Sequence, residues 1–268
     1  MTETFSTIAN NASEAVFPHL RQGLVGAWVP SLGVTGGTLR DVSGRAFHGT
    51  LTNMDPATDW QASGGGSLEF DGTNDYVLLP PRSVELPFSL SVWYRSENLT
   101  KRYQSLFTAN TNISSPSIYC GVHYLSGSSS MIFYGSGQYA ADSDVFTNDS
   151  GWHHYAWSVK LGGAGQYFRD GVHIGAFARN VTATSPTAGS IGAIKNLLTV
   201  GFAAQGDIAG CSRWSRALTA AEIQTLYQTG PGGWLARKRR RVYSIAAAPV
   251  VYGQRLSRHR TILGGGLR

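Results

Sequence analysis

Short runs of alternating hydrophobic and polar residues, separated by turn-forming residues, make up most of this chain. In the clearest run, residues 88–95, alternation places on one face Phe88, Leu90, Val92 and Tyr94. Such a period of two is typical of a half-buried strand. Further strand segments are expected within 67–71, 76–80, 118–124, 131–134, 152–160, 166–174, 197–201 and 211–214. Antiparallel strands with no alternation of strands and helices favour a two-sheet sandwich or jelly roll.

Two local elements are strongly specified. Asp170-Gly171 lies inside the 166–174 segment and supplies the positive φ angles of a type I′ hairpin turn. Thr219, followed three residues later by Glu222, forms a capping box that predicts a short helix. Gly230 and Pro231 end that helix.

Composition agrees with a β-rich protein and divides the charge unevenly. The 268 residues include 33 Gly and 11% aromatic residues, and only 14% are charged. This composition excludes a disordered chain and a coiled coil. Nine of the 22 Lys and Arg residues follow Leu235, and no Asp or Glu occurs there. The preceding part of the chain therefore holds 13 basic residues and all 16 acidic residues. The net charge of +6 therefore belongs to the C-terminal end.

That C-terminal end contains the basic run Arg237, Lys238, Arg239, Arg240 and Arg241. The composition alone is typical of a solvated chain end. The alternative hypothesis is that this segment is an assembly arm held by a neighbouring subunit. An acidic protein surface is the preferred contact over packaged nucleic acid, because nothing else resembles a nucleic-acid module. Residues 1–22, polar apart from a few Phe, Leu, Ile and Val, are expected to be an N-terminal arm.

The sequence predicts no export signal, no membrane-spanning segment and no disulfide bond. No apolar run reaches the roughly 18 residues of a membrane span. The first residues have neither a basic nor an apolar region, so we expect no signal peptide. Cys120 and Cys211 are the only cysteines and are expected to be buried free thiols.

Several ordered motifs span most of the chain. They are 23–28 (GLVGAW), 41–51, 67–77, 88–93 (FSLSVW), 151–155 (GWHHY), 168–172 (FRDGV), 206–208 (GDI) and 215–227. In this order they resemble the laminin-G-like, concanavalin-A-like lectin/glucanase domain family. The resemblance implies an all-β, two-sheet antiparallel jelly-roll sandwich with one short C-terminal helix and extended arms. The expected boundaries are 1–22, 23–229 and 230–268.

Most residues in these motifs have a structural interpretation. Four tryptophans in strand patterns are expected to be core residues rather than sugar platforms: Trp28, Trp93, Trp152 and Trp157. Asp71 and Asp75 bracket a tight turn, where Asp side chains bond their own backbone. In the family, acidic loops often hold calcium, so Asp41, Asp71 and Asp75 are the calcium candidates. Ala209-Gly210 stand where the family has a late carboxylate.

A catalytic role is not expected. Glycoside hydrolysis needs two carboxylates across the scissile bond. Glu69 and Asp71 share a strand face, as in some glucanases, but the third acid expected a few residues later is absent. No nucleophile-elbow, zinc-protease or phosphate-loop motif occurs.

Two function classes remain. The preferred hypothesis is a non-enzymatic virion structural protein, a phage surface decoration, fibre or tail component that is a homo-oligomer anchored by its arms. The alternative is a bacterial carbohydrate-binding module, extracellular or on the cell surface, and a glycoside hydrolase is the least favoured. Exposed Tyr, Trp and Asn near 98–117 and 135–150 are the sources considered for a surface glycan site.

Overall fold

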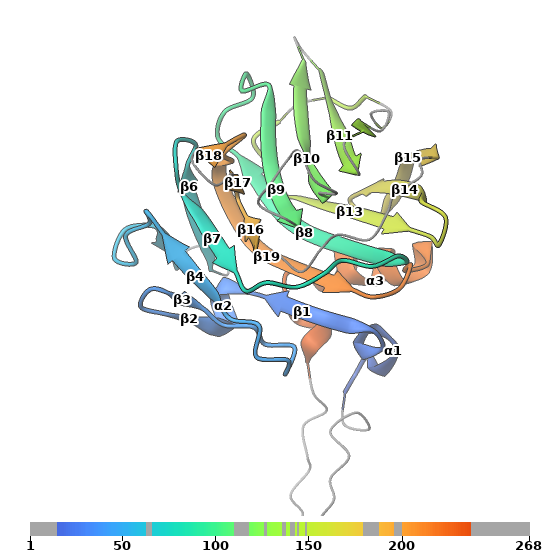
Figure 1. Cartoon of the computed structure of the whole chain (residues 1–268), viewed down its shortest axis with the longest axis horizontal. Helices are drawn as coiled ribbons and strands as arrows, with labels where there is room; N and C mark the ends of the chain where they lie inside the picture. Colours follow the sequence, from blue (N-terminus) through green and yellow to red (C-terminus); the bar gives the residue numbers. More distant parts are fainter. Residues whose placement is uncertain are drawn as a thin grey trace, which may run out of the picture. The chain divides into compact units, whose positions relative to one another are not determined.

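A computed structural model describes residues 15–62, 66–109, 118–125, 128–135, 138–139, 143, 145–147, 149–178, 188–195 and 200–236. Within these ranges the chain forms two facing antiparallel sheets and a separate two-stranded ribbon (Figure 1). This architecture confirms the predicted jelly-roll sandwich. Its few helices lie near the ends of the described chain: α1 (Pro18–Arg21), α2 (Pro30–Gly33), α3 (Ala220–Thr229) and the 3₁₀ turn η2 (Gly233–Leu235).

The first sheet, called the back sheet, is ordered β15-β14-β13-β8-β19-β6-β5, and β1 also pairs with β19. Its long central strands, β8 and β19, pair along most of their length. The strands are β1 (Leu24–Trp28), β5 (Trp60–Gln61), β6 (Ser67–Asp71), β8 (Phe88–Ser96), β13 (His153–Val159), β14 (Ala164–Arg169), β15 (Val172–Ala178) and β19 (Gln205–Trp214).

The second sheet, called the front sheet, is ordered β12-β11-β10-β9-β16-β7-β4-β3-β2. Its strands are β2 (Val34–Thr35), β3 (Thr38–Leu39), β4 (Gly49–Thr52), β7 (Tyr76–Leu79), β9 (Tyr103–Ala109), β10 (Ile118–Leu125), β11 (Ser128–Gly135), β12 (Gln138–Tyr139) and β16 (Gly189–Ile191). The ribbon joins β17 (Ile194–Lys195) to β18 (Val200–Gly201).

Alternation along the strands fills the space between the sheets. The four residues predicted to share a face of β8 all lie in the main core. Trp157 on β13 is fully buried and donates its indole N–H to the Ile132 carbonyl of β11, 3.0 Å away, which links the two sheets. Trp28 is also a core residue. Trp93 and Trp152, by contrast, are only half-buried, and Trp93 stacks on Tyr227 of α3 outside the back sheet.

The two local elements have the predicted geometry. Asp170 and Gly171, with φ of 52° and 78°, form the two-residue turn between β14 and β15. The side chain of Thr219 accepts the Glu222 backbone N–H, the Glu222 carboxylate accepts that of Thr219, and Gly230 caps the far end of α3 at φ 72°. The capping box therefore fixes where the helix begins.

The packed body extends beyond both predicted boundaries. Leu20, assigned to the N-terminal arm, is fully buried, and its carbonyl accepts the indole N–H of Trp214 at 2.7 Å. Trp234, assigned to the C-terminal arm, is 3% exposed and packs against Trp214. Residues 15–22 and 230–236 are consequently parts of the sandwich. Residues 237–268 lie outside the described residues.

Cys120 and Cys211 are buried free thiols, as predicted. Among the described residues, no helix has the length and apolar run needed to cross a membrane.

Candidate functional site

A cluster of rings lies on the outer face of the front sheet. On β10, Cys120 and Val122 belong to the core between the sheets. Because side chains alternate along a strand, Tyr119 and His123 lie on the opposite, outer face. Tyr103 of β9, which pairs with His123, stacks on its imidazole with ring centroids 4.4 Å apart. The sheet register thus places the Tyr103 ring against that of His123, and Tyr119 lies on the same face of β10.

Phe202 completes this cluster from the turn after β18. Its ring lies 5.0 Å from that of Tyr103 and 6.0 Å from that of Tyr119, and the residue is 45% exposed. Its φ of 50° lies in the left-handed region, which is strained for a bulky residue. We call Tyr103, Tyr119, His123 and Phe202 the aromatic platform.

The aromatic platform has a glycine beneath it and a cation beside it. A Cβ at Gly121 would collide with the Tyr119 side chain and the Gln104 carbonyl, so glycine lets the tyrosine ring lie over the strand. Arg102, which is exposed, places its guanidinium 5.1 Å from the Tyr103 ring and its Nε 3.3 Å from the Nε2 of His123. The Phe202 ring is tilted against both tyrosine rings, and Tyr119 and His123 are buried. Phe202 is therefore the exposed ring of the cluster, with hydrogen-bonding groups of Arg102 and His123 nearby.

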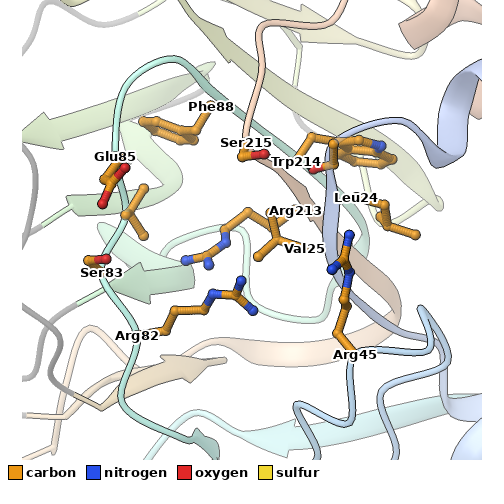
Figure 2. Close-up of a pocket in the computed structure, with 12 residues that line it drawn as sticks. Leu24, Val25, Arg45, Arg82, Ser83, Glu85, Phe88, Arg213, Trp214 and Ser215 are labelled. Atoms are coloured by element: carbon orange, nitrogen blue, oxygen red, sulfur yellow. Dashed lines mark hydrogen bonds between the residues drawn. The ribbon is translucent and has the colours of Figure 1, made fainter.

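A second feature is a cavity of about 330 Å³ at one end of the sandwich. Its walls are the loop between β7 and β8 (82–85), the start of β1, the end of β19 and Arg45. Figure 2 shows Arg82 and Arg213 reaching into the same space, with Arg45 on the opposite side. Burial, reinforced by the nearby charge of Arg82, lowers the pKa of Arg213 to about 10. We call this cavity the arginine pocket.

A polar network lies at the β13–β14 end of the back sheet. The two ring nitrogens of His153 lie 2.7 Å from carboxylate oxygens of Asp149 and Asp170. Burial opposes the protonation of His153, but its hydrogen bonds to the two carboxylates raise its pKa overall. Asp170 also accepts the backbone N–H of His154 at 2.9 Å. The network thus fixes the Asp170-Gly171 hairpin to its neighbouring strand.

The fold corresponds to a known family over more than half of the chain. Residues 71–224 match the family model described as the concanavalin A-like lectin/glucanases superfamily. The chain belongs to this superfamily. No match was found among curated proteins.

Solved structures with a similar fold include an arabinanase domain, a sialidase and a neurotoxin binding domain. Domain 4 of the arabinanase AbnA from Geobacillus stearothermophilus, in complex with arabinotriose, aligns with TM-score 0.58 and 19% identity, over 76% of this chain and 98% of that chain. Trypanosoma rangeli sialidase aligns with TM-score 0.57 and 17% identity, over 77% and 32%. The botulinum neurotoxin serotype D binding domain aligns with TM-score 0.55 and 12% identity, over 78% and 52%. These likenesses show the fold.

The Gly-Asp-Ile motif of this superfamily member has a structural explanation. Gly206 has a φ of 132°, and a Cβ there would collide with the Arg95 carbonyl. Asp207 is 1% exposed, receives the Arg95 guanidinium at 2.6 Å and accepts the Ser67 hydroxyl at 3.0 Å. The motif thus joins β19 to the strands on both its sides.

The calcium candidates are engaged as hydrogen-bond acceptors. Asp41 accepts the backbone N–H groups of Ala27 and Ser43 on one oxygen, and the Ser43 hydroxyl and the Phe47 N–H on the other, at 2.8–3.0 Å. Asp71 accepts three backbone N–H groups of its own turn. In the described part of the chain, no group of three or more His, Cys, Asp or Glu is placed to hold a metal ion. The sequence predicts no cofactor, with calcium at these residues as the alternative, and this stays a prediction.

Asp75 lies beside Asp71 in the same turn. It is 5% exposed, and one carboxylate oxygen accepts the Asp71 backbone N–H at 3.0 Å. Burial, with smaller contributions from nearby carboxylates, raises the pKa of Asp75 to about 6. This carboxyl therefore titrates near neutral pH without forming part of a recognised catalytic pair.

Some of the remaining site candidates from the sequence lie in the described part of the chain and others lie outside it. Glu69 accepts a hydrogen bond from Gln61 at 2.6 Å. Tyr103 comes from the 98–117 segment considered for glycan binding, whereas residues 110–117, 136–137, 140–142, 144 and 148 lie outside the described residues. The basic run, Arg237 to Arg241, also lies outside them. The sequence interpretation missed Phe202 and Arg213; only the alternation from Cys211 to Arg213 was a usable signal.

Proposed function

We propose that this protein is a non-catalytic carbohydrate-binding domain and that the aromatic platform is its sugar-contacting surface. The observation that carries the proposal is Phe202, an exposed aromatic side chain held in a left-handed backbone conformation against two tyrosines. A sugar ring presents an apolar C–H face that packs on an aromatic ring, while its hydroxyls need polar neighbours at the edge. Arg102 and His123 supply polar atoms there.

Backbone strain supports a role beyond packing. A bulky residue at φ 50° costs about 1–3 kcal/mol, which persists only where the surroundings impose it. Burial does not compensate fully, since Phe202 remains 45% exposed. Strained residues are concentrated at ligand sites, so the strain fits a ring that is positioned for contact with a ligand.

The non-catalytic part of the proposal rests on the carboxylates. Asp71 is committed to its own turn, and Glu69 is bonded to Gln61. Neither is free to act as one member of the acid–base pair that glycoside hydrolysis requires. Incubation with oligosaccharides, followed by analysis of the products, tests this: accumulation of cleaved sugars would contradict it.

Phe202→Gly tests the platform directly. Glycine accepts the positive φ, so relief of strain offsets lost ring contacts and the free energy of unfolding should change by no more than about 1 kcal/mol. Binding to a panel of neutral oligosaccharides beginning with arabinotriose, measured by array and calorimetry, should weaken at least tenfold.

Two variants serve as controls. Phe202→Tyr retains the ring and should retain binding. Trp60→Ala removes another aromatic residue, 42% exposed on β5, and should leave binding unchanged. The proposal fails if no saccharide binds, or if Phe202→Gly binds as tightly as the original protein.

A second candidate function is the virion structural role expected from the sequence, with homo-oligomers anchored by the terminal arms. The observation favouring it is that the two ends of the packed body are joined: the Val16 N–H donates to the Ala236 carbonyl at 3.1 Å. The basic run follows at once, so both terminal segments start from one place. Removal of residues 237–268 should abolish assembly, measured by native mass, while the domain remains folded. A monomeric full-length protein would contradict this role.

A further inference from the structure

Arg213 occupies a strand position that faces the interior of the sandwich. Two residues before it, Cys211 lies in the main core, and alternation places Arg213 on the same side of β19. Its ladder partner on β8, Leu90, is also a core residue. Arg213 itself is only 7% exposed. A charged side chain therefore occupies a core-facing strand position, where the alternation predicts an apolar residue.

No described residue provides a counter-charge for this buried cation. Among the residues that the structure describes, every ion pair involves other side chains, and no acceptor is hydrogen-bonded to the Arg213 guanidinium. The neighbouring side chain Arg82 is also a cation, and its charge lowers the pKa of Arg213 further. An unpaired buried charge is strongly unfavourable, and a second like charge adds to the cost.

Arg213 lines a cavity that is large enough for a small-molecule ligand. The arginine pocket has a volume of about 330 Å³, near the lower end of the roughly 300–1,000 Å³ found for small-molecule sites. The burial of its three arginines is graded: Arg213 is buried, Arg82 is half-buried and Arg45 is exposed. Glu85, an exposed residue of the same wall, lies apart from the guanidinium groups in Figure 2.

We propose that the arginine pocket is a binding site for a compact oxyanion, that is, a carboxylate, sulfate or phosphate group, held between Arg213 and Arg82 with Arg45 at the entrance. Planar guanidinium groups recognise such anions through paired N–H donors. The anion supplies the counter-charge that Arg213 does not find among the described residues. This site is separate from the aromatic platform, so it does not depend on the proposed sugar contact.

The same chemistry could be presented by a saccharide acid or by a free inorganic anion. Two probe sets distinguish these sources. Galacturonate is compared with galactose, and sodium sulfate and phosphate are compared with sodium chloride at equal ionic strength. Binding to the full chain is measured by calorimetry, and thermal unfolding is followed in parallel.

Arg213→Met is the decisive variant. It replaces the buried charge with an apolar side chain of similar length, so without anion it should unfold at a higher temperature than the original protein. Its anion affinity should fall at least tenfold. Arg82→Met should weaken binding as well. Arg40→Met, which removes an exposed arginine outside the pocket, should change neither property.

The outcomes separate the alternatives. Arg213-dependent binding of galacturonate but not galactose supports the site and assigns a saccharide acid. Arg213-dependent binding of sulfate or phosphate alone supports it and assigns an inorganic or phosphoryl anion. The proposal is overturned if no probe binds, or if Arg213→Met binds every probe as the original protein does. Phe202→Gly should retain anion binding, so failure of the proposed sugar function would be recognised independently.

Discussion

The backbone N–H of Val16 donates to the carbonyl of Ala236 at 3.1 Å, which joins the first and last described segments of the chain. Arg21 strengthens this junction, because its guanidinium donates to the Leu235 carbonyl at 2.7 Å. Beneath these contacts, Leu20, Trp214 and Trp234 form one cluster with α3. The ends of the domain therefore contribute to its second hydrophobic core.

Matched truncations test these boundaries. Removal of residues 1–14 should leave the melting temperature nearly unchanged, whereas removal of residues 1–22 deletes buried Leu20 and exposes Trp214. Loss of a buried leucine costs about 2–5 kcal/mol, so the longer truncation should be strongly destabilised. Removal of 237–268 compared with 230–268 should give the same contrast, because only the longer one deletes Trp234. Thermal unfolding measures all four; equal melting temperatures within a pair would contradict the boundary.

His154 should make the domain sensitive to acid. It is fully buried, and desolvation lowers its pKa from 6.5 to about 4. The unfolded chain therefore binds a proton that the folded chain resists, and stability falls by about 3 kcal/mol as pH drops from 6.5 to 4. His154→Gln removes this titration. The free energy of unfolding of the variant, relative to that of the original protein, should therefore increase as pH falls from 6.5 to 4. Denaturant unfolding at several pH values measures the difference, with the exposed His173→Gln as control.

Asp75 should act in the opposite sense over almost the same window. Burial raises its pKa from 3.8 to about 6, so the folded chain binds the proton more tightly and stability falls as pH rises from 3.8 to 6. Asp75→Asn keeps an acceptor for the Asp71 N–H and avoids the buried charge. It should be more stable than the original protein at pH 7 and gain nothing below pH 4. An advantage that does not vary with pH would refute this assignment, and Glu85→Gln is the exposed control.

Calcium removal offers a test of the metal candidates. Because Asp41 and Asp71 already accept several hydrogen bonds, we expect a chelator to leave the melting temperature unchanged. A fall on chelation that millimolar calcium reverses would instead assign the ion to one of these turns. Asp71→Asn and Asp41→Asn would then identify which turn binds it.

Local sequence signals were sufficient where neighbouring residues decide the structure. The capping box at Thr219 and the Asp170-Gly171 turn depend on a few adjacent residues, and both have the expected geometry. The inward face of β8 followed equally from alternation, because the period of a strand is fixed by its backbone.

The functional surfaces depended on contacts between distant residues. Alternation places Arg213 on the same face of β19 as Cys211, but the local sequence does not indicate which face points inward. It also does not indicate that the loop before β8 brings Arg82 to the same cavity. The φ of Phe202 has no local signature either, since a glycine immediately precedes it and the sequence permits several turns. Leu20 was assigned to an arm because its partner, Trp214, is almost the length of the domain away.

The two thiols provide a way to observe the sandwich opening. Cys120 belongs to the front sheet and Cys211 to the back sheet, and both lie in the core between them. Burial raises the pKa of each thiol, so neither is nucleophilic in the closed domain. A thiol reagent can modify them only when the layers separate. The labelling rate therefore reports the free energy of that local opening, without any engineered probe.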